Sequence, residues 1–335
     1  MSINLAINGF GRIGRTFLRT IMCDAKARST LNVVGINVGP TPPLNLDLLF
    51  KYDSVMGTYQ GQVSYADNKL VIDGHEITVV SENEPEALPW QRLNVNWVVE
   101  ASGHFTTREQ AQRHPLSENG KILITAPSKD IDISIIPGVN SQAYNASKHR
   151  LISLGSCTTN CFAPLIKVIN DNFTLVQGMM TTTHAYTASQ NLLDNQHKDA
   201  RRARAAATNM VPAATGASKV ITQIFPELEG KISATSLRVP LPIMSLVDFT
   251  FVTQETLTAE KINEAFKTAS AGSLKNIVEY CNKPLVSSDF IGNPHSAIFD
   301  SLLTNSTGSM HKIFAWYDNE FGYSSRLKEF LLHNS

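Results

Sequence analysis

The 335-residue sequence has no excess of either charge, because lysine plus arginine number 29 and aspartate plus glutamate also number 29. A chain without net charge has no general attraction to nucleic acid or to an anionic membrane surface. Charged residues make up only 17% of the chain, below the roughly 25% of average soluble proteins. That low fraction suits a protein that covers part of its surface with other subunits.

Long apolar runs and frequent cysteines are also missing. No segment approaches the about 20 apolar residues of a membrane span, and the start, MSINLAING, lacks the features of a signal peptide. The cysteines are too few and too scattered for a disulfide scaffold: Cys23, Cys157, Cys161 and Cys281. We therefore expect a cytoplasmic protein with no membrane segment, long enough for two domains.

The clearest positive signal is a glycine-rich turn near the start. An apolar run from Ile3 to Ile7 predicts a buried strand, and Gly9, Gly11 and Gly14 follow in G-x-G-x-x-G spacing. Apolar residues then recur at helical period: Ile13, Phe17, Leu18 and Ile21. A strand, a glycine turn and a helix in this order are typical of a dinucleotide-binding site, where a side chain at Gly11 would keep the pyrophosphate from the helix amides.

The next strand departs from the usual dinucleotide-binding pattern. It is predicted at 31–37, and Val38-Gly39-Pro40 follows where an NAD-binding fold usually has Asp or Glu. Losing that acid removes an acceptor for the ribose of NAD, and also the charge that repels the 2′-phosphate of NADP. Further runs at 95–103 and 121–128 predict an open parallel sheet, with short strands at 59–64 and 70–80 and a hairpin turn at Asp73-Gly74.

Cys157 and Cys161 lie in the segment SLGSCTTNC and allow several interpretations: half a metal site, a redox pair, a nucleophile or two core residues. Turn residues precede Cys157 and a helical apolar period follows it, which predicts that Cys157 lies at a helix N-terminus. Amides there favour a thiolate and can stabilise an oxyanion. Cys161, one turn later, is predicted to be a core residue. A metal site needs two further ligands, and none is close in sequence.

A nucleophilic cysteine needs a base, and His184 ends the β-branched run MMTTTHA. A histidine at a strand terminus is well placed to take a thiol proton, although by itself it is equally an ordinary cap or surface residue. Anion-binding residues occur later: arginines near Arg202, Thr215-Gly216 before a helix, and Arg238 at a strand edge before prolines. Each one alone also fits a solvated surface.

Together these segments resemble phosphorylating glyceraldehyde-3-phosphate dehydrogenases over nearly the whole chain. The matching strings are INGFGRIGR, FKYDSVMG, SCTTNC, HAYT, HKD followed by RRARAA, TGASK, LRVP and WYDNE. The resemblance implies an α/β protein, with a Rossmann-type dinucleotide-binding domain at 1–156, completed by a C-terminal helix at 319–335. A catalytic α+β domain with a mixed sheet then covers 157–318.

The resemblance also implies a mechanism. Cys157 attacks the aldehyde of glyceraldehyde 3-phosphate to form a hemithioacetal, and His184 activates the thiol and then takes the hydroxyl proton as hydride leaves for the nicotinamide. Inorganic phosphate cleaves the resulting thioester to give 1,3-bisphosphoglycerate. The implied cofactor contacts are Gly9, Gly11, Arg12, Ile13, Gly14, Val38, Thr125 and Asn319. The implied substrate and phosphate contacts are Ser156, Thr158, Thr187, Arg202, Thr215, Gly216 and Arg238.

Three departures from the family pattern bear on the cofactor and its surroundings. Val38 replaces the NAD-selecting Asp, Asn195-Gln196 replace an apolar residue and proline, and Phe321 replaces a tryptophan. The first two favour NADP use or dual use with NAD, and so leave the glycolytic and the gluconeogenic direction open. The loop at 187–204 is expected to reach a neighbouring subunit, which predicts a homotetramer. The alternatives are an erythrose-4-phosphate dehydrogenase, and a cofactor-binding fold with a non-enzymatic surface or regulatory role.

Overall fold

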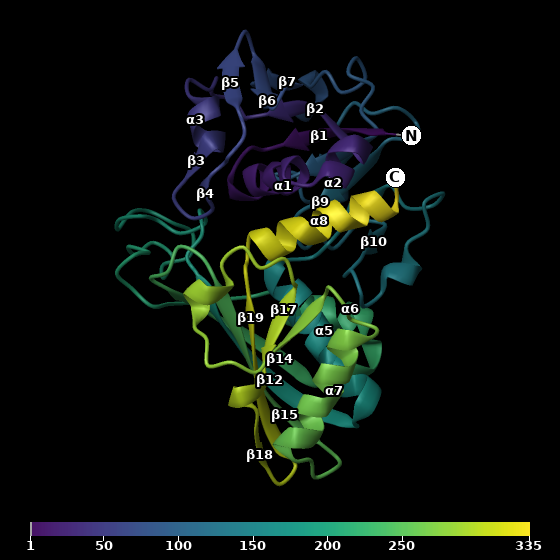
Figure 1. The fold of residues 1–335 in the computed structure, drawn as a ribbon, viewed down its shortest axis with the longest axis vertical. Helices are drawn as coiled ribbons and strands as arrows, with labels where there is room; N and C mark the ends of the chain where they lie inside the picture. The colour runs from purple at the N-terminus through teal and green to yellow at the C-terminus, as the bar shows by residue number, and fades with distance from the viewer. Residues whose placement is uncertain (1) are drawn as a thin grey trace. The chain divides into compact units, whose positions relative to one another are not determined.

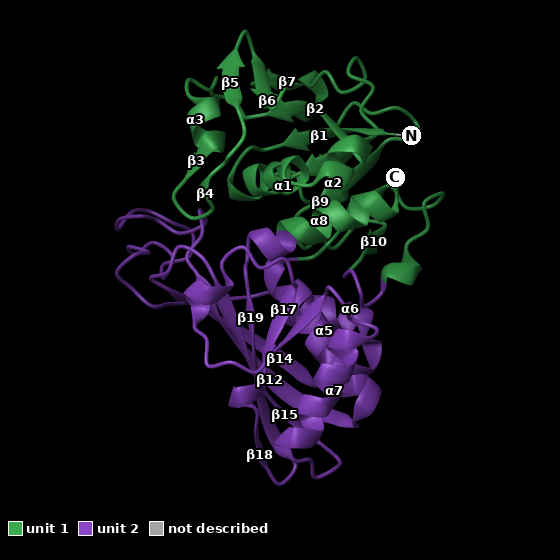
Figure 2. Ribbon diagram, in the orientation of Figure 1, with its two compact units in different colours: residues 1–135, 141–155, 324–335 green, residues 136–140, 156–323 purple. Residues whose placement is uncertain are grey.

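The computed structural model describes residues 2–335, and these form two compact units (Figure 1). The first unit contains the described residues up to 135, residues 141–155 and residues 324–335. The second contains residues 136–140 and 156–323, as Figure 2 shows in purple. The chain therefore passes between the units more than once, and its last helix returns to the first unit.

The first unit is built on a nine-stranded sheet whose strands are parallel except at one edge, where β5 and β6 run antiparallel to their neighbours. The central strands are buried along most of their length, as a parallel sheet covered on both faces requires. In spatial order the strands are β10 (Ile133–Ser134), β11 (Leu151–Ser153), β9 (Lys121–Ile124), β8 (Trp97–Glu100), β1 (Ile3–Asn8), β2 (Leu31–Asn37), β7 (His75–Val80), β6 (Lys69–Ile72) and β5 (Val63–Ala66).

The helices of this unit begin where the sequence supplies caps. Asp24 accepts hydrogen bonds from the amides of Lys26 and Ala27, and Thr107 forms a capping box with Gln110. The helices are α1 (Arg12–Met22), α2 (Ala25–Thr30), α3 (Leu46–Lys51) and α4 (Arg108–Ala111). A two-stranded ribbon consists of β3 (Tyr52–Asp53) and β4 (Gly57–Thr58), and single 3-10 turns cover Pro85–Ala87 and Ser141–Ala143.

The last helix, α8 (Phe321–His333), contributes its residues from 324 onward to the first unit. Leu327 and Leu331 are fully buried, and the ring of Phe330 meets Trp97 edge-on at 6.0 Å. Lys328 also forms an ion pair of 2.7 Å with Asp24. The apolar face predicted for this helix is therefore buried in the first unit.

The second unit is built on a mixed sheet with helices on one of its faces (Figure 1). Buried and half-buried residues alternate along β15, and Phe249 of that strand packs on Phe162 of α5 at 4.9 Å between ring centroids. The strand order is β13 (Val211–Ala213), β14 (Ile232–Val239), β12 (Leu175–Ala185), β15 (Ser245–Thr253), β19 (Met310–Tyr317), β17 (Ala297–Asp300) and β16 (Val278–Cys281), with β18 (Asn305–Thr307) beside β19. The helices are α5 (Cys157–Asn172), α6 (Ala217–Ile224) and α7 (Ala259–Ala271), and 3-10 turns cover Pro226–Leu228, Ser287–Phe290 and Ser301–Leu303.

Most local predictions hold, with a few corrections. The hairpin turn at Asp73-Gly74 is confirmed, because both residues have positive φ (49° and 82°) between β6 and β7. The strand expected at 59–64 is found only at Val63–Ala66, and the segment at 70–80 is part of two strands. No helix forms at the arginine-rich segment 199–207 of the described chain, which folds as turns. Across residues 2–335, no helix has the length and apolar character needed to cross a bilayer.

Candidate active site

Cys157 is the first residue of α5, as predicted, because Ser156 ends the preceding segment as an N-cap. Ser156 has extended backbone (φ −106°, ψ 168°), and its Oγ accepts a hydrogen bond of 3.1 Å from the amide of Thr159. The positive end of the helix dipole therefore lies at the thiol. This local geometry follows from the short sequence around the cysteine alone.

His184 reaches the same thiol from β12. Its Nε2 lies 3.4 Å from Sγ of Cys157, which is hydrogen-bond distance for sulfur. Strand β14 runs parallel to β12 and places Arg238 directly opposite His184 in the register. Strand β14 is flanked by β13 and β12, so Arg238 lies inside the sheet rather than at the strand edge expected from the sequence.

The imidazole of His184 is buried, at 4% exposure. Its second nitrogen, Nδ1, contacts two groups that fix the orientation of the ring. Nδ1 lies 2.7 Å from the carbonyl oxygen of Ala185 and 2.8 Å from Nη1 of Arg238. Burial, followed by the charge of Arg238, lowers the pKa of His184 to about 3. The ring is thus neutral near neutral pH. The carbonyl oxygen of Ala185 can only accept, and it takes a hydrogen bond of 3.1 Å from Nη1 of Arg238 as well as the one from Nδ1. The tautomer with its hydrogen on Nδ1 leaves Nε2 free to accept the thiol proton.

The amides at the helix start favour the thiolate, as expected, but burial has the larger effect on the thiol. Burial raises the pKa of the Cys157 thiol, and it outweighs the opposing effects of Arg238 and of the backbone and hydroxyl of Thr158. The thiol is therefore protonated until a base removes the proton. His184 is the base within reach.

Tyr317 connects the two elements that carry this pair, a role that its place in the string WYDNE did not indicate. Its hydroxyl lies 2.9 Å from the hydroxyl of Thr158 on α5 and 2.7 Å from that of Thr182 on β12. Its ring also meets the imidazole of His184 edge-on at 6.0 Å. Tyr317 thereby fixes the start of α5 relative to the end of β12.

Asn319 lies just beyond β19 and is 5% exposed. Its Oδ1 accepts a hydrogen bond of 3.2 Å from Ser245 Oγ, which in turn accepts one from the amide of Ala185. The carboxamide is therefore oriented by a chain of contacts that begins beside His184. Ser245 is a second residue of this site that no sequence motif indicated.

Part of the predicted anion-binding set is brought together in the second unit. Ser189 Oγ lies 2.9 Å from Thr187 Oγ1 and 3.5 Å from Nη1 of Arg202, whose Nη2 is 3.5 Å from the carbonyl oxygen of Ala214. Thr215 and Gly216 follow Ala214 and precede α6, and Gly216 is its N-cap. The charges of Arg202 and Arg238 also act on one another. The two cations therefore lie in the same region of the unit.

Cys161 is fully buried among the apolar residues that α5 packs against the sheet. Its predicted role as a core cysteine is confirmed. Within residues 2–335, the structure contains no group of three or more His, Cys, Asp or Glu side chains placed to hold a metal ion.

The first unit has a pocket of about 520 Å³ at the carboxyl ends of β1, β2, β7 and β8. A Cβ on Gly9 (φ +96°) would lie 2.5 Å from the backbone of Ser102, and one on Gly14 would lie 2.2 Å from the carbonyl oxygen of Gly9. Gly11 instead faces open space at the start of α1. This is the cradle that a pyrophosphate requires. The lining residues are Asn8, Gly9, Phe10, Gly11, Asn37, Val38, Gly39, Pro40, Glu82, Asn83, Ala101, Ser102, His104 and Phe105.

Three predicted cofactor residues of this unit, Arg12, Ile13 and Thr125, are not part of the pocket lining. Arg12 and Ile13 open α1, and Nη1 of Arg12 pairs with Asp53 at 2.5 Å. Thr125 follows β9 and bonds the carbonyl oxygen of Glu100 through both its amide and its hydroxyl, each at 3.0 Å.

Comparisons with known proteins agree with both sites. Residues 3–108 match the family model described as glyceraldehyde 3-phosphate dehydrogenase, NAD binding domain, and residues 156–319 match the C-terminal domain of the same family. The chain belongs to the glyceraldehyde-3-phosphate dehydrogenase family. As a member of that family it is an oxidoreductase that acts on an aldehyde group with a nicotinamide dinucleotide.

Full-length relatives in this family are closely similar. The chain is 47% identical over 325 residues to glyceraldehyde-3-phosphate dehydrogenase 2 of Synechocystis, with 96% of each chain covered. It is 44% identical to the enzyme named glyceraldehyde-3-phosphate dehydrogenase 2 in Streptomyces avermitilis, covering 98% of this chain and 97% of that one. With the protein of the same name from Bacillus subtilis, identity is 41% over 99% of this chain and 97% of the relative.

Proposed function

We propose that this chain oxidises glyceraldehyde 3-phosphate and couples the oxidation to phosphorylation by inorganic phosphate, yielding 1,3-bisphosphoglycerate. The observation that carries the proposal is the Cys157–His184 contact of 3.4 Å at the start of α5. A thiol beside a neutral base, at the amides of a helix start, is suited to covalent attack on an aldehyde.

The proposed reaction begins when Nε2 of His184 takes the thiol proton and Sγ of Cys157 bonds to the aldehyde carbon. His184 passes that proton to the former carbonyl oxygen, which forms the hydroxyl of a hemithioacetal and leaves the imidazole neutral. His184 then accepts that hydroxyl proton while the carbon loses a hydride and the C–O double bond re-forms as a thioester. The oxidised nicotinamide, when bound, accepts that hydride. Asn319 is proposed to orient its carboxamide, since its own amide is fixed by Ser245.

Phosphorolysis completes the proposed cycle. An oxygen of inorganic phosphate attacks the thioester carbon, the C–S bond breaks, and Cys157 leaves as a thiolate. Two anions must then be held near one thiol. Arg238 and Thr187 are proposed for the substrate phosphate; for inorganic phosphate, the proposed residues are Ser156, Thr158, Arg202, Thr215 and Gly216. The support is the position of Arg238 opposite His184 and the chain of contacts from Thr187 to Arg202.

For the cofactor we propose use of both NAD and NADP. Val38 brings no carboxylate to the end of β2, so nothing there repels a 2′-phosphate. Equally, the pocket's described lining includes no lysine or arginine that would select for that phosphate. Arg12, Ile13, Gly14 and Thr125 are proposed to support the turn around the pyrophosphate.

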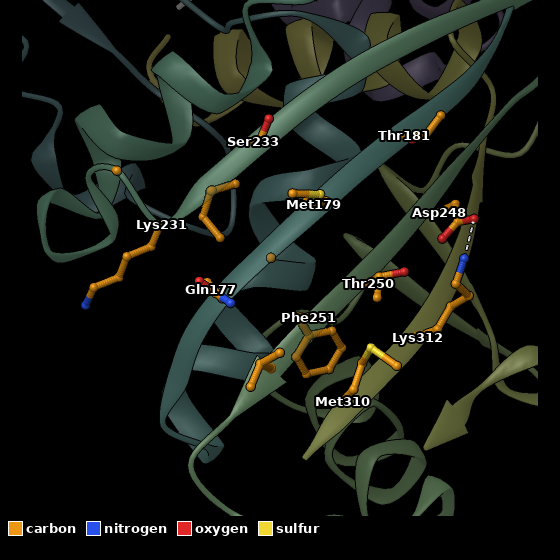
Figure 3. A pocket seen from close by; sticks show the side chains of 14 residues that line it. Gln177, Met179, Thr181, Lys231, Ser233, Asp248, Thr250, Phe251, Met310 and Lys312 are labelled. Atoms are coloured by element: carbon orange, nitrogen blue, oxygen red, sulfur yellow. Dashed lines mark hydrogen bonds and ion pairs between the residues drawn. The ribbon is translucent and has the colours of Figure 1, made fainter. Parts of the chain in front are cut away.

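The proposed assembly is a homotetramer. The sheet face of the second unit opposite its helices carries Met179, 74% exposed, and Met310, 51% exposed. Both line a hollow of about 550 Å³ on β12, β14, β15 and β19. Figure 3 shows this hollow, with Met310 on the strand of Lys312, which forms an ion pair with Asp248. Other exposed apolar side chains occur in and near the loop that begins at Thr187: Leu192, Leu193 and Met210. Exposed apolar side chains on both segments support more than one interface in a closed assembly.

We also propose a dinucleotide-binding domain at 1–156, completed by 319–335, and a catalytic domain at 157–318. The first unit supports the former and the second unit the latter, although residues 136–140, 156 and 319–323 belong to the second unit. The proposed location is the cytoplasm. Its support is that all four cysteines are free thiols, as a reducing compartment would keep them.

The deciding experiment measures initial rates of cofactor reduction with glyceraldehyde 3-phosphate and phosphate, for the wild type and for Cys157→Ser. The wild type should reduce the cofactor only when both substrates are present. The variant should bind NAD or NADP as before but lose dehydrogenase activity. A variant as active as the wild type would refute the proposed nucleophile.

A further inference from the structure

Glu100, the last residue of β8, is almost fully buried in the first unit, at 1% exposure. Its Oε1 accepts hydrogen bonds from the amide and the hydroxyl of Ser102 at 2.8 and 2.5 Å. Its Oε2 accepts one from Nδ2 of Asn8 at 2.6 Å and one from Nε2 of His114 at 3.0 Å. All four contacts are donors, so both oxygens are used fully as acceptors.

His114 is oriented by a second buried group. Its Nδ1 lies 3.3 Å from Nε1 of Trp90, and an indole N–H can only donate. Nδ1 is therefore the acceptor, and the ring hydrogen is on Nε2, directed at Glu100. His114 and Trp90 are not part of the pocket lining. His114 reaches the pocket through Glu100 and through an edge-on ring contact of 6.1 Å with the lining residue Phe105.

The same network continues to the other side of the pocket through two asparagines. The Nδ2 of Asn37 donates to Oδ1 of Asn8 at 2.7 Å and to the carbonyl oxygen of Glu82 at 3.0 Å. Its Oδ1 accepts from the amides of Gly39 and Glu82 at 3.2 and 3.0 Å. The carboxylate and the Asn37 amide thus have their hydrogen-bonding capacity used, and Asn8 links the two in one connected network.

This network of hydrogen bonds therefore joins every loop that forms the pocket. The network begins after β8 at Ser102, and the Oγ of Ser102 also accepts a hydrogen bond from the amide of His104. It passes through the end of β1 and finishes at Gly39 after β2 and at Glu82 after β7. The pocket-lining residues among these come from four different strand ends. Backbone hydrogen bonds also join the strand ends at this edge, from Gly9 to Asn37, from Val38 to Val80 and from Ala101 to Asn8, and the side-chain network extends these connections into the loops.

We propose that Glu100 is the positioning residue of the dinucleotide pocket, acting by holding the loops after β1, β2, β7 and β8 at the spacing that the cofactor requires. It acts through Asn8, Asn37 and Ser102 rather than by touching the reacting atoms. The inference rests on the proposed function, because it takes the ligand of this pocket to be NAD or NADP.

The Glu100→Gln variant has nearly the shape of the wild type but replaces one acceptor oxygen with an NH₂ group. Turned toward Asn8 and His114, the NH₂ faces two donors. Turned toward Ser102, it faces the amide donor, and the hydroxyl must reverse to accept from it, so either orientation loses at least one hydrogen bond of the network. The dissociation constants for NAD and for NADP, measured by calorimetry, should both rise about tenfold or more. The KM for the cofactor should rise similarly, while kcat at saturating cofactor stays within about twofold.

Two further variants separate positioning from general stability. Asp132→Asn is the matched control, because Asp132 is a carboxylate of the same unit that accepts from the amides of Arg150 and Leu151 and is absent from the pocket lining. It should lower the melting temperature and leave the dissociation constants unchanged. His114→Leu removes one donor to Glu100 from outside the pocket, and should weaken cofactor binding by a smaller factor. It takes the place of Glu100→Gln if that protein does not fold.

The outcomes are distinct. Weaker binding in Glu100→Gln or His114→Leu, with normal binding in Asp132→Asn, supports the proposal. Unchanged binding in the Glu100 or His114 variant overturns it, as does equal weakening in Asp132→Asn, which would indicate loss of stability only. If the wild type itself binds neither NAD nor NADP, the proposed function fails first.

Discussion

His184 and Cys157 lie 27 positions apart in the sequence, on β12 and α5, yet Nε2 and Sγ are 3.4 Å apart. The contact joins a helix start, where partial positive charge accumulates, to a strand end that holds a neutral imidazole. Neither residue is activated by its own element alone. Burial raises the pKa of the Cys157 thiol and lowers that of the His184 imidazole. Transfer of the thiol proton to the imidazole therefore depends on the short distance between them.

Replacing His184 with Asn should therefore abolish most activity while preserving the fold. Asn cannot take the thiol proton, and loss of a general base costs about 10²- to 10⁴-fold in rate. Steady-state kinetics with saturating cofactor and phosphate measures the effect. His295→Asn is the control, because His295 contacts Asn293 and Glu279 instead of the thiol. Near-normal kcat in His184→Asn would exclude the general-base role.

A second prediction concerns Tyr317, whose hydroxyl bridges Thr158 and Thr182. Tyr317→Phe should reduce the free energy of unfolding by about 1–2 kcal/mol, because two buried hydroxyls lose their shared partner. It should also lower kcat, since the start of α5 is no longer fixed relative to β12. Urea denaturation and steady-state kinetics test the two effects. A variant with unchanged stability would show that the threonines find other partners.

The sequence predicts the parts of the site that are determined locally. The glycine turn, the capped start at Cys157 and the strand ending near His184 each follow from a short stretch of residues. Tyr317, Ser245 and Glu100 could not be found in this way, because their roles depend on partners far along the chain: Tyr317 and Thr158 are 159 positions apart. Glutamate, serine and tyrosine are also common residue types, so these three positions cannot be recognised before their tertiary contacts are known. The sequence predicts the position of the Cys157 thiol at a helix start, but it does not predict the burial of that thiol, which sets its pKa.

Asp53 gives a prediction for acid stability. Burial, the largest effect, raises its pKa, but the hydrogen bond from Arg12 and the amides of Met56 and Val55 together outweigh it and hold the pKa at about 2. Because the folded-state value is below the unfolded one, this contribution is fully present above about pH 4 and is lost as pH falls toward 2.

Asp53→Asn should consequently destabilise the protein by about 1–2 kcal/mol at pH 7, after allowance for solvent screening. The difference from the wild type should shrink as the pH is lowered from 4 to 2. Chemical denaturation across this range measures it. A destabilisation independent of pH would mean that packing, rather than the charge on Asp53, is responsible.

Val38 offers a direct test of cofactor choice. Val38→Asp restores a carboxylate at the end of β2, which can accept from the ribose hydroxyls of NAD and repel the 2′-phosphate of NADP. The ratio of kcat/KM for NAD to that for NADP should rise about tenfold or more. Val38→Asn provides a polar side chain of the same shape without the charge, and should move the ratio much less. Equal shifts in both variants would show that charge repulsion is not the cause.

The exposed sheet face of the second unit supplies the last prediction. Met179 lies on β12 at the edge of the hollow formed with β14, β15 and β19 (Figure 3). If two copies pair through this face, a two-fold interface repeats every substitution, so Met179→Glu buries two carboxylates without partners. Sedimentation velocity should then show a species of half the wild-type mass. Thr268→Glu, an exposed position on α7 among the helices of the other face, should leave the assembly intact. An unchanged tetramer in Met179→Glu would mean that this face is not an interface, and the apolar residues near the loop at 187–204 would then have to hold the subunits together by themselves.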